Sequence, residues 1–519
     1  MSKRRLLFNS VSGVSLLATN IVIAFVMTPI MVHHLGNSNY GIWELLVALV
    51  GYLGIFELGI GPALVRYVAD AWSREDRAAV ARIFNTGVFS LAGTGAVGLV
   101  VLLVVATWPE HFMSLTGPDA RRLAPVLVVF GLNLAAYLPR TALSAYLLGL
   151  QAHLFVNVIQ GAVAIIASVA MYYVLTQGSA SPLIWLAMIV LFGTLLQSAA
   201  MLYWILVVDA RVCITASSFS WSTAKELLGF GLKSTIIQAS TGMLVKLTGF
   251  AIAYTVGVGQ LVYFVVPSRL VDYANSLGTQ LGFPLTPYFT HLAGNGNPAA
   301  ARSAWLQTTR ILQIMMFLLP IGIIVLGEPF IRLWIGQEYA EKGRWTLYIL
   351  CAALLAQGVV SNGARILMSL GRHGRVAWFA AIFAPICLAV SLGLGAVWGI
   401  EGVAAAVALY TVGVHAVEVT LTCFVLDVGI GEYLRATVFR FTVPIVVTTA
   451  TLIGLRVMSY PASYGQLILY GLVGGVIYFV TVWLMALEPA ERKGLLDVVV
   501  RRRQRASNET RPRLDSGGA

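Results

Sequence analysis

The chain has 519 residues, of which 58% are hydrophobic and only 11% charged, and its mean hydropathy is +0.84. A soluble protein carries about 25% charged residues, so this composition excludes an ordinary soluble enzyme. The net charge of +12 would indicate nucleic-acid binding in a soluble domain. Here the charges lie in short loops and indicate orientation in a membrane, so no nucleic-acid partner is predicted. The four cysteines form no C-x-x-C pair, and neither a metal site nor a cofactor is expected.

Hydrophobic stretches long enough to cross a bilayer recur along the whole chain. A spanning helix needs about 20 apolar residues, because each adds about 1.5 Å through a hydrocarbon core about 30 Å thick. The fourteen predicted spans are residues 11–32, 41–65, 83–107, 122–147, 154–176, 182–207, 231–257, 260–289, 306–327, 345–366, 376–398, 402–425, 436–456 and 465–487. The first span follows the basic opening without a cleavage site, so we expect it to be retained. The predicted class is an all-α integral membrane protein with about 14 transmembrane helices.

Lysine and arginine are distributed unevenly between the loops on the two sides. With the N-terminus inside, the cytoplasmic loops receive Arg74, Arg77, Lys225 and Arg372, together with a tail rich in arginine. The opposite loops receive few basic residues. Because basic loops stay in the cytoplasm, both termini are predicted to be cytoplasmic.

Two stretches suggest an internal repeat. Leu58-Gly59-Ile60-Gly61-Pro62 in the second span resembles Leu281-Gly282-Phe283-Pro284 in the eighth. A parallel repeat of six spans predicts two lobes, residues 1–207 and 208–426, followed by helices 13 and 14 in residues 427–487 and a basic cytoplasmic tail in 488–519. So short a match also arises by chance, and both interpretations stay open.

No enzyme motif has a suitable setting. Ser222-Thr223-Ala224-Lys225 fits S-x-x-K but lies in a short loop, and His33-His34 has no carboxylate or cysteine at ligand spacing. The longest extracytoplasmic loop, residues 328–344, is too short for the active site of a membrane glycosyltransferase or polymerase. We therefore predict that the chain has no enzymatic activity.

Four stretches in register resemble a known family. Residues 56–69 (FELGIGPALVRYVA) resemble the F-x-L-G-hydrophobic-G-x-A-hydrophobic-x-R-Y/F signature of polysaccharide flippases. Residues 35–43, 329–340 and 398–404 match further stretches of the same family, over about residues 8–425. The chain thus resembles the polysaccharide transporters, the O-antigen and exopolysaccharide flippases, whose superfamily also holds lipid II flippases and multidrug MATE exporters.

This resemblance implies a location, a fold and a substrate. It implies a multi-pass protein of the bacterial inner membrane with two six-helix lobes in a MATE-like V-shaped bundle. The implied substrate is an undecaprenyl-diphosphate-linked oligosaccharide, moved to the periplasmic leaflet for lipopolysaccharide or exopolysaccharide biosynthesis. Membrane lipid, a polysaccharide polymerase and glycosyltransferases are the implied partners.

Ionisable groups inside spans are costly unless they face a cavity or a partner, so each is a functional candidate. Lys246 and Arg269 lie about 16 Å and about 13 Å below the periplasmic ends of their spans. We expect these two cations to bind the diphosphate, and Arg140, which is deeper, to receive the headgroup first. The alternative is an internal ion pair, because Asp272 lies one turn from Arg269 on the same face.

A candidate hinge lies in the second span. Glu57 precedes Gly59, Gly61 and Pro62, which predict a break that exposes backbone groups beside the carboxylate, as at transport sites. A simple packing kink is the alternative.

Three further residues are candidates for coupling or gating. His415 and Glu418 are three residues apart and are predicted to carry a proton, with satisfied packing as the alternative. Arg66, beside Tyr67 at the cytoplasmic end of the second span, is predicted to anchor at the headgroups or to close a gate.

Two rival functions stay open. A MATE-type multidrug or metabolite antiporter, driven by sodium or protons, would require acidic groups such as Glu57 and Asp272. A non-transporting partner of a polysaccharide synthase is the other.

Overall fold

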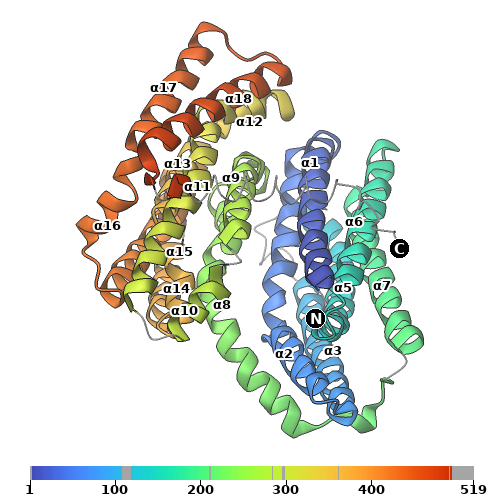
Figure 1. The fold of residues 1–519 in the computed structure, drawn as a ribbon. Coiled ribbons are helices and arrows are strands. Elements are labelled where there is room, and N and C mark those ends of the chain that lie inside the picture. The colour runs from blue at the N-terminus through green and yellow to red at the C-terminus, as the bar shows by residue number, and fades with distance from the viewer. Residues whose placement is uncertain are drawn as a thin grey trace, which may run out of the picture. The chain divides into compact units, whose positions relative to one another are not determined.

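The computed structural model describes residues 3–107, 118–209, 212–282, 285–294, 298–360, 362–489 and 491–493, and these ranges contain helices and no strand (Figure 1). The helices up to the middle of the chain are α1 (Lys3–Leu53), η1 (Gly54–Glu57), α2 (Ile60–Ser73), α3 (Arg77–Thr107), α5 (Pro118–Gly149), α6 (His153–Thr176), α7 (Pro182–Tyr203), η2 (Trp204–Asp209), η3 (Ala216–Ser218), α8 (Trp221–Thr255) and η4 (Val258–Gln260). The remaining helices are α9 (Leu261–Gly282), α10 (Leu285–Gly294), α11 (Pro298–Trp334), α12 (Gln337–Lys342), α13 (Arg344–Val360), α14 (Gly363–Ser369), α15 (Gly374–Val425), α16 (Ile430–Ala436), η5 (Phe439–Phe441), α17 (Thr442–Met458), α18 (Tyr464–Thr481) and η6 (Val482–Ala486).

Many of these helices are long and apolar enough to cross a membrane. Among the described residues there are 9 such segments, or up to 10 if the bent pair α13 and α14 forms one span. The prediction of an all-α integral membrane protein is confirmed. The count of fourteen spans stays a prediction.

One segment contains two predicted spans, and another contains one span and the first part of the next. α15 has 52 residues, which as a straight helix would measure about 78 Å, more than twice the thickness of a hydrocarbon core. It is interrupted at Gly399 (φ 64°, ψ −142°), and α1 is interrupted in the same way at Gly36 (φ 71°, ψ 168°). Glycine adopts a positive φ without steric cost, so both glycines join one predicted span to the next.

The chain forms two compact units. Unit 1 comprises Met1–Ser268, Trp334–Ile349 and Gly374–Tyr410, and unit 2 comprises Arg269–Leu333, Leu350–His373 and Thr411–Ala519. The boundaries between the units differ from the predicted lobe boundaries at residues 207 and 426, and the division into lobes stays a prediction.

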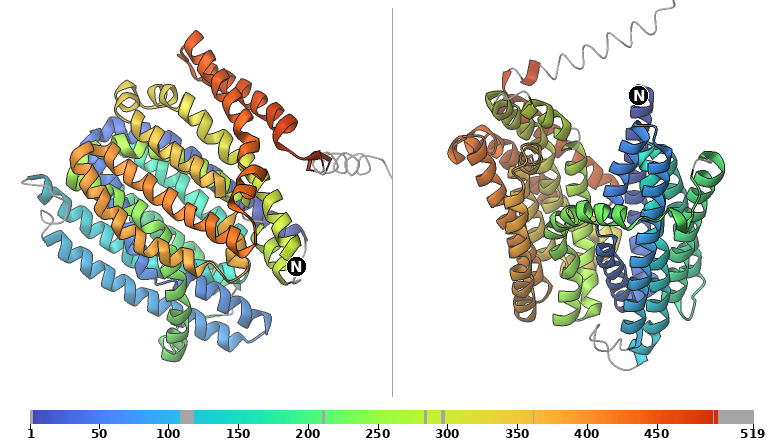
Figure 2. Two further views of the ribbon diagram at one scale, coloured as in Figure 1. Left: turned by 90° about the vertical axis from the view of Figure 1, so that its left-hand side faces the viewer. Right: turned by 90° about the horizontal axis from the view of Figure 1, so that it is seen from below.

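Small residues allow close helix packing in unit 1. α3 packs along α5 (Figure 2). A Cβ added to Gly98 would lie 2.5 Å from the Leu134 side chain, and one added to Gly95 would lie 3.2 Å from the Ala135 backbone. Helices pack in this way in lipid, where van der Waals contact between close backbones replaces the hydrophobic effect.

A buried ion pair fastens the C-terminal part of unit 2. α17 and α18 lie side by side (Figures 1 and 2), and Gly474 accommodates the Leu452 side chain between them. Behind η6, the Glu491 carboxylate accepts hydrogen bonds from Nε (2.8 Å) and Nη2 (2.6 Å) of Arg310 in α11. Both side chains are buried, so the Glu491 charge depends on Arg310, which also lies 3.4 Å from Oε1 of Glu488.

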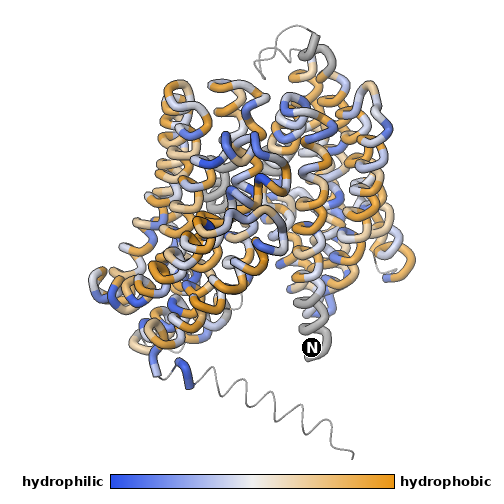
Figure 3. Tube along the Cα trace, turned by 90° about the horizontal axis from the view of Figure 1, so that it is seen from above, coloured by the Kyte–Doolittle hydropathy of each residue, from blue (hydrophilic) through white to orange (hydrophobic). Residues whose placement is uncertain are grey.

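The outer faces of the helices are apolar. Hydrophobic residues predominate along the helices in Figure 3, and large apolar side chains such as Val397, Phe424 and Met458 are exposed. Exposing such area to water costs about 25 cal/mol per Å², a penalty that lipid removes. The exposed apolar faces therefore fit a membrane environment.

Candidate functional site

The second predicted span is broken at Leu58 and Gly59. The helix tightens into η1, then Leu58 (φ 51°) and Gly59 (φ 67°) adopt left-handed conformations, and α2 begins at Ile60. A positive φ is unfavourable for a branched residue such as Leu58, so the surrounding packing holds this turn. The exposed Pro62 occupies the first turn of α2, where its missing N–H costs nothing.

Two glycines at this break let neighbouring groups come close to the backbone, the α8 backbone at Gly59 and the Glu57 side chain at Gly61. A Cβ on Gly59 would lie 2.3 Å from the Gly231 carbonyl oxygen of α8. A Cβ on Gly61 would lie 2.0 Å from Oε1 of Glu57, whose carboxylate accepts a hydrogen bond from the Gly61 backbone N–H. The structure thus shows an interrupted helix with a carboxylate at the start of its second half. The role of the break as a hinge remains a prediction.

Arg140 lies within electrostatic range of Glu57. Its side chain is buried, Nη1 donates to the Gln197 amide oxygen at 2.7 Å, and the guanidinium carbon is 4.7 Å from the centre of the Tyr137 ring. The charges of Arg140 and Glu57 attract each other, although 83 positions of sequence separate them. The sequence analysis named both residues but did not pair them.

The proposed diphosphate cations are only partly visible. Lys246 lies among the residues of α8 whose side chains are outside the described part of the structure. Arg269 and Asp272, both in unit 2, interact electrostatically, as the ion-pair alternative requires. Binding of the diphosphate by Lys246 and Arg269 stays a prediction.

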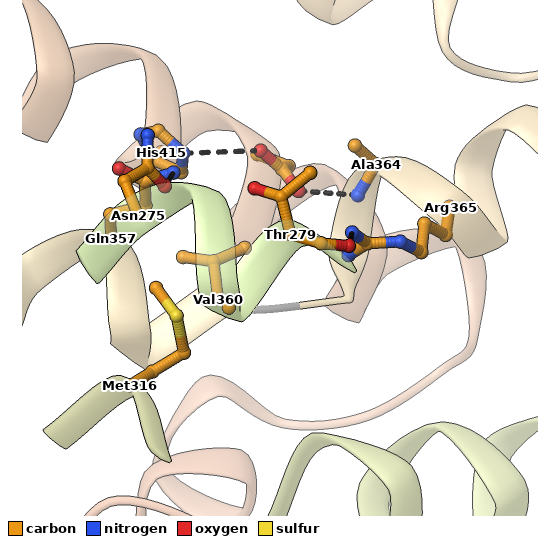
Figure 4. Close-up of a pocket in the computed structure, with 10 residues that line it drawn as sticks. Asn275, Thr279, Met316, Gln357, Val360, Ala364, Arg365 and His415 are labelled. Atoms are coloured by element: carbon orange, nitrogen blue, oxygen red, sulfur yellow. Dashed lines mark hydrogen bonds and ion pairs between the residues drawn. The ribbon is translucent and has the colours of Figure 1, made fainter. Parts of the chain in front are cut away.

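Unit 2 contains a polar pocket of about 260 Å³ (Figure 4). Residues of five helices line the pocket, and four of these helices contribute polar side chains. The lining residues are Asn275, Gly278 and Thr279 of α9, Met316 of α11, Gln357 and Val360 of α13, Ala364 and Arg365 of α14, and His415 and Glu418 of α15. Gln357 donates to Asn275 at 3.0 Å, so the two amides hold each other in place at one side of the pocket.

His415 and Glu418 face each other in this pocket. The Nδ1 atom of His415 is 2.7 Å from the Thr411 carbonyl oxygen, and Nε2 is 3.9 Å from Oε2 of Glu418. The other carboxylate oxygen, Oε1, accepts a hydrogen bond from the Ala364 backbone N–H at the start of α14. The structure therefore brings together the two residues that the sequence analysis paired, and connects them to the break between α13 and α14.

Arg365 is a residue of this pocket that the sequence analysis missed. It donates to the Thr279 carbonyl oxygen at 3.0 Å and to Oδ1 of Asn362 at 3.4 Å, and its charge interacts with that of Glu418. A Cβ on Gly282 would lie 2.4 Å from the guanidinium carbon, so this glycine of the second repeat motif makes room for the arginine. Arg365 lies one residue from the predicted end of its span, where a cation is ordinarily an interfacial anchor.

Arg66 and Tyr67 pack on the neighbouring helix. The Arg66 guanidinium carbon is 4.7 Å from the centre of the Phe230 ring of α8, and the Tyr67 ring meets the same ring edge-on at 6.1 Å. These contacts fasten α2 to α8. Whether Arg66 anchors or closes a gate stays a prediction.

Two of the family-like stretches meet in unit 1. Asn37 donates to the Tyr263 hydroxyl (2.9 Å) and accepts from that of Tyr339 (2.8 Å). The Tyr263 hydroxyl donates to Glu338, which also accepts from Lys342 at 2.8 Å. This Asn37 network joins residues of both predicted lobes through loops predicted to be extracytoplasmic.

The fold is that of known membrane transporters. No family model matches the chain. The lipid II flippase MurJ, in an inward closed conformation, gives a TM-score of 0.68 at 14% identity and covers 92% of this chain and 98% of its own. A second similar structure is a multidrug resistance MATE family transporter of the MOP superfamily in an inward-facing conformation. Its TM-score is 0.65 at 15% identity, and the match covers 78% of this chain and 98% of the transporter. The chain is therefore a multi-pass membrane protein with the fold of MOP-superfamily transporters.

A more specific similarity comes from the sequence. The chain is 20% identical over 339 residues to a Shigella flexneri protein named "Putative O-antigen transporter". The matched region covers 64% of this chain and 77% of that protein. The predicted resemblance to polysaccharide transporters is confirmed. The Shigella protein is thus named as a transporter, and MurJ as a flippase.

Proposed function

We propose that this chain translocates undecaprenyl-diphosphate-linked oligosaccharide repeat units across the bacterial inner membrane for O-antigen or exopolysaccharide biosynthesis. The observation that carries the proposal is the presence of arginines within the spans of this fold: Arg140 is buried in unit 1 and Arg365 lines the pocket in unit 2. Guanidinium groups bind phosphate oxygens through paired hydrogen bonds. The similarity to an O-antigen transporter supports the same substrate class.

In this mechanism the diphosphate enters a cationic interior from the cytoplasmic side while the polyprenyl chain remains in lipid. Arg140, Lys246 and Arg269 are the proposed contacts, and the break at Gly59 and Gly61 lets α2 move relative to the first half of its span. Release on the periplasmic side then delivers the unit to a polymerase.

Reconstitution tests the proposal directly. Purified protein in proteoliposomes should move a fluorescent prenyl-diphosphate-linked oligosaccharide between leaflets, which is measured by quenching or enzymatic modification of the label from outside. Arg140→Gln should slow this movement by at least about tenfold, since about 1.4 kcal/mol corresponds to that factor. Normal movement by Arg140→Gln would remove this arginine from the substrate path.

Orientation needs a separate measurement. Reporter fusions at Thr223 and at the C-terminus should be active in the cytoplasm, and one at Glu338 in the periplasm. A periplasmic C-terminus would contradict both the proposed topology and an even number of spans.

A MATE-type antiporter is the second candidate, favoured by Glu57 beside the broken helix of unit 1. It predicts that expression of the chain lowers cellular accumulation of organic cations. The proposed flippase leaves this accumulation unchanged and restores polymer export to cells that lack their own transporter.

A further inference from the structure

We propose that the pocket of unit 2 binds the hydroxyl groups of one sugar ring of the transported oligosaccharide, through the amides of Asn275 and Gln357 and the carboxylate of Glu418 (Figure 4). The inference deepens the proposed function, on which it rests for the lipid-linked source of the sugar. It gives the sugar a subsite of its own, apart from the proposed diphosphate contacts.

The first argument is the set of hydrogen-bonding atoms in the pocket. The hydrogen bond between Gln357 and Asn275 uses Nε2 of the first amide and Oδ1 of the second. Within the described part of the chain, Nδ2 of Asn275 and Oε1 of Gln357 have no partner, so the amide pair offers a donor and an acceptor side by side. Oε2 of Glu418 is another acceptor, because Nε2 of His415 is 3.9 Å away and too distant for a hydrogen bond.

The second argument is that these atoms fit a hydroxyl group better than an ion. A hydroxyl both donates and accepts, so two neighbouring hydroxyls of a sugar satisfy the donor and the acceptor of the amide pair together. A phosphoryl group only accepts, and in this position it would face the oxygens of Gln357 and Glu418 with no hydrogen between them. A cation would face the guanidinium of Arg365, whose charge interacts with that of Glu418. A neutral ring meets neither repulsion.

The third argument is that other helices fix the break between α13 and α14, on which the pocket is built. The Val359 carbonyl lies in the last turn of α13, where no backbone N–H of that helix reaches it. It accepts hydrogen bonds from Nε2 of Gln313 in α11 (3.1 Å) and from the Tyr433 hydroxyl in α16. On the other side of the break, Glu418 accepts the Ala364 N–H. The pocket is therefore preorganised, which reduces the entropy cost of binding a ligand.

The size and the apolar lining of the pocket agree with a single sugar ring. Small-molecule pockets start at about 300 Å³, so a pocket of about 260 Å³ holds one ring and not a whole repeat unit. Gly278 leaves no room for a Cβ beside Met316, and these two residues line the pocket with apolar surface for the C–H face of a ring. In the predicted topology, the polar lining residues lie in the cytoplasmic halves of spans eight, ten and twelve, the side from which the substrate enters.

Calorimetry on the full-length protein in detergent tests the proposal. The probes are short-chain prenyl diphosphates that carry glucose, galactose or N-acetylglucosamine. The reference ligand is the methyl ester of the same prenyl diphosphate, which keeps the charge and lacks the sugar. At least one of the three sugars should raise the affinity above that of the methyl ester by about tenfold, which corresponds to about 1.4 kcal/mol.

Two double variants make the test specific. Asn275→Leu/Gln357→Met keeps the shape of both side chains and removes both partners of their hydrogen bond together, so neither amide is left unpaired and the fold should be kept. It should bind all four ligands with equal affinity. Asn133→Leu/Thr194→Val removes a buried pair of unit 1, in which the Thr194 hydroxyl donates to Asn133 at 2.7 Å, and it should keep the sugar-dependent gain. Thermal unfolding of both variants checks that they are folded.

Deoxy sugars locate the hydroxyls that the pocket binds. In the wild type, at least one deoxy analogue of the preferred sugar should bind about fivefold more weakly than the complete sugar. In Asn275→Leu/Gln357→Met the same analogue and the complete sugar should bind equally. This comparison of ligand and protein changes isolates the interaction between the hydroxyl and the amide pair.

Three results would overturn the sugar subsite: equal affinity of the wild type for all four ligands, a sugar-dependent gain that persists in Asn275→Leu/Gln357→Met, or its loss in Asn133→Leu/Thr194→Val. Methyl glycosides of the same sugars serve as ligands without lipid. Their binding, if the amide variant abolishes it, shows that the sugar alone suffices, and a gain with the diphosphate-linked forms alone shows that the pocket recognises the sugar as part of the lipid headgroup. A sugar-dependent gain without translocation in proteoliposomes would refute the proposed function and leave the subsite intact. Equal translocation of the sugar-linked and methyl esters by the wild type and the amide variant would refute the subsite alone.

Discussion

Units 1 and 2 contain the same arrangement in two versions. In each, a carboxylate accepts the backbone N–H of the second residue of a helix that follows a break: Glu57 from Gly61 in α2, and Glu418 from Ala364 in α14. Each carboxylate also interacts electrostatically with an arginine, Arg140 in unit 1 and Arg365 in unit 2.

The two versions differ in what surrounds the charges. Arg140 is buried and is held by Gln197 and the Tyr137 ring, so its position is fixed. In unit 2 the Glu418 carboxylate faces His415, whose Nε2 atom lies 3.9 Å from Oε2. The comparison teaches that the same backbone contact can accompany different surroundings: in unit 1 the arginine is held by an amide and a ring, whereas in unit 2 the carboxylate faces a second ionisable side chain.

The largest expected effect comes from filling the space beside Glu57. Gly61→Leu should reduce polymer export by well over tenfold, because its side chain would occupy the position of the carboxylate. Export and membrane protein level are measured together. Gly93→Leu in α3 is the matched control, since a Cβ there meets nothing within 4 Å. If both variants export normally, the break in unit 1 is ordinary packing.

The next effect tests whether the charges on α9 act on substrate or on each other. If Arg269 binds the diphosphate, Arg269→Ala should abolish export, and Arg269→Ala/Asp272→Ala should remain inactive in a normally inserted protein. If the two residues only neutralise each other, the double variant should regain export, because no buried charge is left unpaired. The polymer exported per inserted molecule decides between them.

A smaller effect on transport is expected when the ion pair between Arg310 and Glu491 is broken, because this pair contributes to stability alone. Arg310→Ala leaves Glu491 buried without its cation and should destabilise unit 2 by about 3–5 kcal/mol. Thermal unfolding of the detergent-solubilised protein measures this loss. Arg310→Ala/Glu491→Ala should recover part of it, and transport per folded molecule should stay near that of the wild type. A specific loss of transport in the double variant would assign this pair to the pathway.

The smallest effect is expected at the surface of unit 1. Hydrogen bonds from Lys342 and Tyr263 lower the pKa of Glu338 below its usual 4.5. A lowered folded-state pKa contributes stability that is present above pH 4.5 and lost as the pH falls through the folded value. Glu338→Gln should therefore lower the unfolding temperature slightly at neutral pH and flatten its decline below about pH 4.5. If the unfolding temperature falls with pH in the same way in both proteins, the hydrogen bonds of Glu338 contribute nothing to stability.

Composition and hydropathy predicted the class, because long apolar helices can be solvated by lipid regardless of how they pack. The break before Gly61 was also visible, since glycines and a proline clustered beside a carboxylate within one span. His415 and Glu418 were paired because three positions place two side chains on one helical face.

Contacts between residues of different helices could not be predicted from such local sequence patterns. The approach of Glu57 to Arg140 depends on how η1 packs on α5, which hydropathy does not encode. Arg365 lies near a predicted span end, where cations are common, and only its position against Gly282 reveals a pocket residue. Arg310 was missed for a similar reason, because its partner Glu491 lies beyond the last span.

The Asn37 network has a consequence for biosynthesis. Its hydrogen bond from Tyr339 to Asn37 joins residues 302 positions apart. At about 5–20 residues per second, the ribosome needs about 15–60 s to make the intervening chain. Throughout that interval Tyr339 does not yet exist, so the partly exposed Asn37 amide exchanges its hydrogen bonds with water until unit 1 is complete.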